Sequence, residues 1–217
     1  MSNYHIKHLE EYYQVYRKSV RNPEAFWEEI AEEHFVWRKR WNNVLSWDFS
    51  KPEVKWFEGA KLNITENCLD RHLPTRGNKT AILFEPNDPK EEAEHITYHQ
   101  LHERVCKMAN VLLEKGIKKG DRVCIYLPMI PELAVSVLAC ARIGAIHSVV
   151  FAGFSANALS TRINDSDCKL VITSDGSFRG AKTIDLKGIV DKALEECPGI
   201  NTVLVAKRIN SKIEMKA

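Results

Sequence analysis

The sequence predicts an α/β fold in which a parallel sheet carries helices on both faces, preceded by a helical N-terminal arm. Two observations predict it. From residue 81 onward, short apolar runs alternate with helix-length segments, and these runs are apolar throughout, as is typical of parallel strands covered on both faces. All five tryptophans precede residue 57, so the chain divides into two regions of different composition.

The N-terminal region predicts two helices followed by an irregular segment. Asn22 is a candidate N-cap with Pro23 at the first helical position, so a second helix is expected through Phe26, Trp27 and Ile30. From Trp41 to Ala60 no periodicity remains, and we expect an irregular arm. The first helix is predicted by apolar residues at three- and four-residue steps, namely Tyr4, Ile6, Leu9, Tyr13, Tyr16 and Val20.

The second region alternates predicted strands with predicted helices. Glycines at 116 and 144 and the Pro198-Gly199 pair mark helix ends. Strands of the sheet are expected at 81–84, 123–127, 147–151, 170–173 and 202–206, and helices at 98–115, 131–143, 155–163 and 183–196. The polar tail from Lys207 to Ala217 is expected to be loose and stops without completing an element.

Composition excludes several classes of protein. With 217 residues, 44% of them hydrophobic and 28% charged, the chain is expected to form a packed core. A net charge of +2 is too small to attract nucleic acid or an anionic membrane through the overall electrostatic field of the protein. No apolar run approaches the ~20 residues that span a bilayer. The N-terminus lacks an apolar signal segment, and the six cysteines include no C-x-x-C pair, so we expect free thiols and a cytoplasmic location.

Two segments that follow predicted strands are candidate binding loops, because ligands of open parallel sheets sit at the carboxyl ends of the strands. Phe151-Ala152-Gly153 offers an aromatic ring beside small residues. Arg179-Gly180-Ala181-Lys182 places two cations around two small residues ahead of a predicted helix start, which suits a phosphate. Spacing alone favours a solvated loop with surface cations; the alternative is a site in which Phe151 lies against a base and Arg179 and Lys182 bind phosphate.

Other patterns predict no chemistry. The stretch ending at Lys182 lacks the spacing of a Walker A loop, and no Gly-x-Ser-x-Gly elbow occurs. His95, His99 and His102 have no carboxylate or cysteine at tight spacing to complete a metal set, so no metal site is predicted. Spacing alone identifies no catalytic residue in this chain.

Five blocks of the sequence stand out together, namely Asn22–Trp27, Trp56–Leu73, Gly120–Val123, Tyr126–Glu132 and Ala139–Phe151. In this order they resemble the AMP-forming acetyl-CoA synthetases, members of the adenylate-forming superfamily, and Trp56–Leu73 resembles the segment that opens the large domain of that family. The resemblance runs from about residue 5 to about residue 205.

This resemblance implies an acetate–CoA ligase that forms acetyl-adenylate and pyrophosphate from acetate and ATP, with Mg²⁺ in the complete enzyme, and then transfers the acetyl group to CoA. It implies that the CoA nucleotide is held by Phe151, Ala152 and Gly153 and by the motif Arg179, Gly180, Ala181 and Lys182. In that family glycine is also common at the positions of Ala152 and Ala181, and an arginine often replaces Lys182.

The family's ATP-phosphate loop, adenine motif and C-terminal catalytic lysine find no match in this chain. The resemblance therefore implies residues 1–65 as the synthetase N-terminal helical region and residues 66–217 as the first part of the AMP-binding domain. The remainder of the enzyme would be a partner, with acetate, ATP and CoA as substrates and no ligand tightly bound to this part. A propionate-preferring ligase, a non-catalytic CoA- or nucleotide-binding module and an assembly module remain alternatives.

Overall fold

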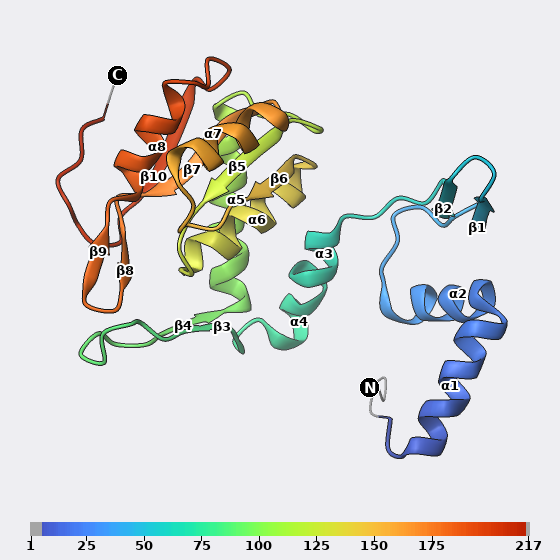
Figure 1. The fold of residues 1–217 in the computed structure, drawn as a ribbon. Coiled ribbons are helices and arrows are strands. Elements are labelled where there is room, and N and C mark those ends of the chain that lie inside the picture. Colours follow the sequence, from blue (N-terminus) through green and yellow to red (C-terminus); the bar gives the residue numbers. More distant parts are fainter. Residues whose placement is uncertain (1–5, 216–217) are drawn as a thin grey trace. The chain divides into compact units, whose positions relative to one another are not determined.

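The computed structural model describes residues 6–215, which form two compact units that divide between Asn63 and Ile64. Within its described residues the N-terminal unit contains two helices and one antiparallel hairpin, which Figure 1 labels. Its elements are α1 (Leu9–Arg21), α2 (Pro23–His34), β1 (Asn43–Asp48) and β2 (Glu53–Glu58). The predicted helical arm is thus present, but the segment expected to be irregular contains an antiparallel strand pair, which corrects that prediction.

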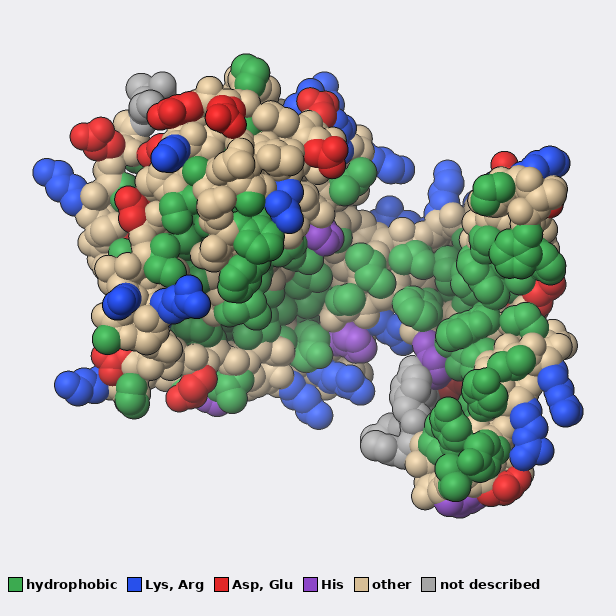
Figure 2. Space-filling view, in the orientation of Figure 1, with side chains coloured by type: hydrophobic (Ala, Val, Ile, Leu, Met, Phe, Trp, Pro, Cys, Tyr) green, Lys and Arg blue, Asp and Glu red, His purple; other side chains and the backbone are tan. Residues whose placement is uncertain are grey.

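The second helix of the N-terminal unit begins as the sequence predicts, whereas α1 begins only at Leu9, so Ile6 of the predicted stripe precedes the helix. The Asn22 side chain accepts a hydrogen bond from the Ala25 amide and caps α2, with Pro23 in its first turn. A small core of Ala31, Trp41 and Val44 holds α2 against β1. No residue of α1 is buried, and Figure 2 shows hydrophobic side chains gathered on the visible face of this unit. Of the predicted α1 stripe, Tyr4 lies outside the described residues.

The larger unit is an α/β layer structure. Its helices and strands run from α3 to β10 (Figure 1). They are α3 (Ile64–Cys68), η1 (Asp70–His72), α4 (Leu73–Arg76), β3 (Thr80–Phe84), β4 (Glu94–Thr97), α5 (Tyr98–Glu114), β5 (Arg122–Tyr126), α6 (Pro131–Ile143), β6 (Ile146–Val149), α7 (Ala156–Asp165), β7 (Cys168–Ser174), β8 (Ser177–Arg179), β9 (Lys182–Ile184), α8 (Leu186–Leu194) and β10 (Thr202–Ala206).

Four strands form the central sheet in the order β10-β7-β5-β6, and every neighbouring pair is parallel. Alternate residues of β5 face opposite helical layers. Val123 and Ile125 pack in one core with α5 and α6, while Cys124 and Tyr126 pack in a second core with α7 and α8. The predicted parallel sheet with helices on both faces is therefore confirmed.

Three local predictions are wrong. The apolar run 81–84 does not join the sheet, because β3 pairs antiparallel with β4 in a separate two-stranded sheet. The segment from Thr183 does not start a helix: it belongs to β9, which pairs with β8, and α8 begins only after its N-cap, Asp185. Residues after β10 are not loose, because buried Asp175 binds three of their backbone amides.

Candidate functional site

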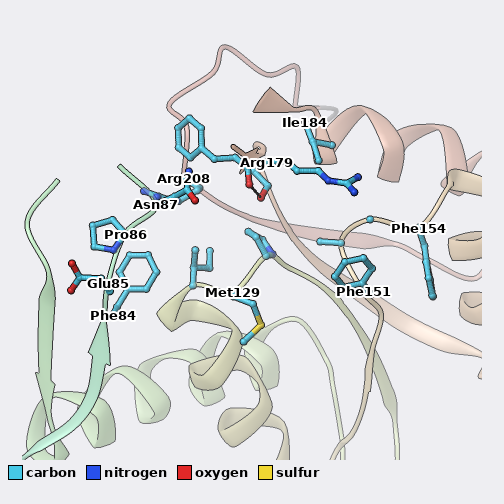
Figure 3. Close-up of a pocket in the computed structure, with 16 residues that line it drawn as sticks. Phe84, Glu85, Pro86, Asn87, Met129, Phe151, Phe154, Arg179, Ile184 and Arg208 are labelled. Carbon is cyan, nitrogen blue, oxygen red and sulfur yellow. Dashed lines mark hydrogen bonds between the residues drawn. The ribbon is translucent and has the colours of Figure 1, made fainter. Parts of the chain in front are cut away.

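A cavity of about 800 Å³ lies at the carboxyl ends of the parallel strands. Its walls come from the segments that follow β5, β6, β7 and β10, together with the segment that follows β3 (Figure 3). This is the position at which open parallel sheets bind ligands. The lining of the cavity includes Phe84, Asn87, Met129, Phe151, Ala152, Gly153, Phe154, Phe178, Arg179 and Arg208.

The turn after β6 presents an aromatic ring to the cavity. The Phe154 amide donates to the Phe151 carbonyl over 3.0 Å, which closes the turn, and the two rings meet edge to face with centroids 5.9 Å apart. The hydroxyl of fully buried Tyr126 in β5 donates to the Phe154 carbonyl over 2.7 Å and ties the turn to the sheet. Phe151 nevertheless remains 71% exposed. An exposed ring on a fixed turn offers a stacking surface for a planar ligand.

Gly153 permits this arrangement because its backbone lies against the Phe151 ring. A Cβ atom at position 153 would lie 2.4 Å from Cε1 of Phe151, much closer than two non-bonded carbon atoms normally approach. Any larger residue would push the ring away. Ala152 also lines the cavity, so the three predicted residues of this turn lie together in it.

The predicted cation motif lies on the hairpin formed by β8 and β9. Arg179 and Lys182 are directly opposite in the antiparallel register, and Gly180, with φ +60°, opens the two-residue turn between them. Side chains of opposite residues project from the same face of a hairpin, where like charges repel each other. Among residues 6–215 neither side chain forms an ion pair, so a bound anion would relieve the repulsion.

Only part of the cation motif reaches the cavity. Arg179 lines it together with the Phe151 turn, whereas Gly180 and Ala181 line a neighbouring cavity of about 350 Å³. Lys182 lines neither of these two cavities. The N-terminus of α8 was expected to add amide donors for a phosphate beside this motif. Its Gly188 amide instead donates a hydrogen bond to the Asp185 carboxylate over 2.8 Å.

Arg208 lines the cavity and buried Asp175 supports its backbone, although the sequence pattern singled out neither residue. Asp175 follows β7 directly and is 1% exposed. Burial raises the pKa of its carboxyl, but the hydrogen bonds from the amides of Arg208, Ile209, Ser211 and Gly176 together outweigh burial and lower the pKa below its ordinary value. Arg208 follows β10, and its side chain lines the cavity. The rule that directed attention to segments after strands applies to both residues.

No metal centre or membrane span emerges within residues 6–215. No group of three or more histidine, cysteine or acidic residues there could hold an ion, so the histidines at 95, 99 and 102 form no metal set. No helix there combines the length and apolar character needed to cross a bilayer. All six cysteines are free thiols; burial raises the pKa of Cys124 and of Cys140 to about 12.

Comparison with known proteins gives a consistent picture over the whole chain. Residues 69–216 match the family of AMP-binding enzymes, and residues 12–68 match the acetyl-coenzyme A synthetase N-terminus. The acetyl-coenzyme A synthetase of Saccharophagus degradans is 53% identical over 212 residues, which are 98% of this chain and 33% of that protein. Acetyl-coenzyme A synthetase 2 of Pseudomonas aeruginosa is 52% identical over 204 residues, 94% of this chain and 32% of that protein.

A solved structure agrees with these relatives. Acetoacetyl-CoA synthetase from Streptomyces lividans superimposes with a TM-score of 0.84 at 29% identity, over 91% of this chain and 30% of that chain. This chain therefore spans about a third of the length of the curated relatives that it matches.

Proposed function

Because this chain belongs to the family of AMP-binding enzymes and its first 68 residues include an acetyl-coenzyme A synthetase N-terminus, we propose that it forms the N-terminal part of an AMP-forming acetate–CoA ligase. In the proposed reaction an acetate oxygen attacks the α-phosphorus of ATP and pyrophosphate leaves. The CoA thiol then attacks the carbonyl carbon of acetyl-adenylate, and AMP leaves as the carbon–sulfur bond forms.

The contribution of this chain is to bind the nucleotide end of CoA. The observation that carries this proposal is that the Phe151 turn and Arg179, from loops after two different strands, line the same cavity. Phe151 stacks on the adenine, Gly153 and Ala152 leave room for it, and the Arg179 guanidinium pairs with a phosphate. Lys182 adds charge from the same face of the hairpin, with Gly180 and Ala181 forming its turn.

The chemical steps belong to the remainder of the enzyme. No residue of this chain is assigned to the transfer of the adenylyl or acetyl group. Mg²⁺ would accompany ATP in the complete enzyme, where it would neutralise charge on the phosphates. Six free thiols suit a reducing compartment, and we place the enzyme in the cytoplasm.

Steady-state assays of the complete enzyme, with this chain as its N-terminal third, test the proposal. Formation of acetyl-CoA, AMP and pyrophosphate should require acetate, ATP and CoA, and acetate should be preferred over propionate. The 217-residue chain alone should catalyse no acetate-dependent exchange between ATP and pyrophosphate. Preference for propionate would reassign the substrate. ATP–pyrophosphate exchange by the isolated chain, or a coding frame that stops after Ala217, would contradict the proposal that the remainder of the enzyme carries out the chemical steps.

A further inference from the structure

We infer that Arg208 is a positioning residue that clamps the β8–β9 hairpin against the segment after β3 and so holds Arg179 on the cavity. The clamp itself follows from contacts within residues 64–215. Its effect on CoA rests on the proposed function. Arg208 lies outside both loops to which the sequence resemblance assigns a role.

The Arg208 side chain connects three segments that are distant in sequence. Its guanidinium carbon lies 5.6 Å from the centre of the Phe84 ring at the end of β3 and 5.0 Å from the centre of the Phe178 ring in β8. Its Nη1 atom donates to Glu91, in the connection between β3 and β4, over 2.9 Å. Two aromatic contacts and one ion pair thus engage the guanidinium of a side chain that is only 16% exposed.

Asp175 fixes the backbone from which this side chain projects. Its carboxylate accepts hydrogen bonds from the amides of Arg208, Ile209 and Ser211 at 2.7, 3.1 and 3.1 Å. Its own amide donates to the carbonyl of Ala206, the last residue of β10, over 2.9 Å. The clamp is therefore anchored on the ends of two neighbouring strands of the main sheet, β7 and β10.

The hairpin depends on contacts with the rest of the fold because its own pairing is short; at its β9 end Ile184 packs against the second core, and at its β8 end Phe178 contacts Arg208. Each of its strands has three residues, and an isolated two-stranded pair of this size is marginal in water. Phe178, which Arg208 contacts, directly precedes Arg179 in β8. A second link connects the same two segments, since the Asn87 side chain donates to the Gly180 carbonyl over 3.4 Å. Release of Phe178 would free the backbone that carries Arg179.

Arg208 and Arg179 differ in whether their charge is available to a ligand. Arg208 is neutralised by Glu91 and shielded by rings, so it has little to offer a phosphate. Arg179 forms no ion pair among the described residues and is exposed. Arg208 therefore acts through Arg179 rather than beside it.

A double-mutant cycle in the complete enzyme tests this dependence. Arg208→Gln should raise the KM for CoA roughly tenfold, equivalent to about 1.4 kcal/mol, and leave kcat and ATP–pyrophosphate exchange unchanged. In an Arg179→Ala background the same change should add less than about twofold, because the residue that it positions is gone. Arg208→Lys, which keeps the ion pair but loses the planar contact with the rings, should lie between wild type and Arg208→Gln.

Two further measurements separate the clamp from general destabilisation. Arg122→Gln removes an ion-paired arginine at the opposite ends of the strands and should leave the KM for CoA unchanged. Hydrogen exchange should show the backbone amides of residues 177–184 exchanging about tenfold faster in Arg208→Gln, with the central strands unaffected.

Each failure has a distinct pattern. Unchanged hairpin exchange, or an equal effect of Arg208→Gln in both backgrounds, would overturn the clamp even if Arg179→Ala weakens CoA binding. Faster hairpin exchange with an unchanged KM for CoA in both Arg179→Ala and Arg208→Gln would support the clamp and overturn the assignment of the hairpin to CoA.

Discussion

Replacing Arg179 with alanine should weaken CoA binding and spare adenylate formation. A hydrogen bond between charged groups contributes about 1.5–3 kcal/mol, which corresponds to roughly ten- to hundredfold in affinity. Arg179 is exposed in the described structure, so ions screen its charge, and we expect the lower end, about tenfold at moderate salt. Because the nucleotide is remote from the thiol, the loss should appear in the KM for CoA rather than in kcat.

The assay measures the two half-reactions of the complete enzyme separately. Acetate-dependent ATP–pyrophosphate exchange reports the first, and acetyl-CoA formation at varied CoA concentration reports the second. Lys182→Ala should raise the KM for CoA less than Arg179→Ala, because an ammonium group offers a single point contact. Arg104→Ala, which removes a half-buried, ion-paired cation outside the cavity, is the control and should change neither half-reaction.

Two results would refute this reasoning. Loss of exchange in a folded Arg179→Ala enzyme would place the residue on ATP or acetate instead of CoA. An unchanged KM for CoA at low and high salt would leave the hairpin as a solvated loop with surface cations.

Three other predictions follow from the contacts of single residues. Gly153→Ala should raise the KM for CoA by about tenfold or less, because the added Cβ displaces the Phe151 ring and base stacking contributes about 1–3 kcal/mol. An unchanged KM for CoA would mean that the ring does not stack on the nucleotide. Asp175→Asn should lower the urea midpoint of unfolding at pH 7. Because the folded-state pKa of Asp175 lies below its ordinary 3.8, the stability difference between wild type and Asp175→Asn should vanish as pH falls through that folded-state value. A stability difference that does not change with pH would contradict a role for the carboxylate charge. Native protein at pH 8 should be alkylated at exposed Cys68 but not at Cys124, whose pKa is about 12, and peptide mass spectrometry that finds both labelled would contradict the burial of Cys124.

The central sheet was predictable from sequence because its strands are apolar on both faces. Runs such as the one ending at Tyr126 lie between two helical layers, so nearly every side chain must be apolar. The run ending at Phe84 has the same composition but pairs with β4 outside that sheet. An apolar composition therefore predicts a strand but does not specify which strand lies beside it, and in β3 it does not guarantee burial either, since Leu83 is exposed.

The N-terminal hairpin escaped prediction for the opposite reason. Most residues of β2 are exposed, including Val54 and Trp56, so the strand lacks the two-residue alternation that marks a half-buried strand. Its pairing with β1 depends on the backbone register, which no single side chain reveals.

The candidate site was predictable where it follows from local position. Phe151 and Arg179 come after strands of a parallel sheet, so their loops share one edge of it. The clamp was not predictable in this way, because Arg208 and its partner Glu91 are 117 residues apart and meet only through the fold. Lys182 is near Arg179 in sequence, yet the hairpin keeps it outside the cavity that Arg179 lines.

The most direct test of the central claim is a crystal structure of the complete enzyme with CoA bound. The account predicts that the adenine ring lies against Phe151 and that a phosphate of the same nucleotide lies within hydrogen-bond distance of the Arg179 guanidinium. A nucleotide bound elsewhere, with the cavity between the Phe151 turn and the β8–β9 hairpin filled only by water, would contradict it.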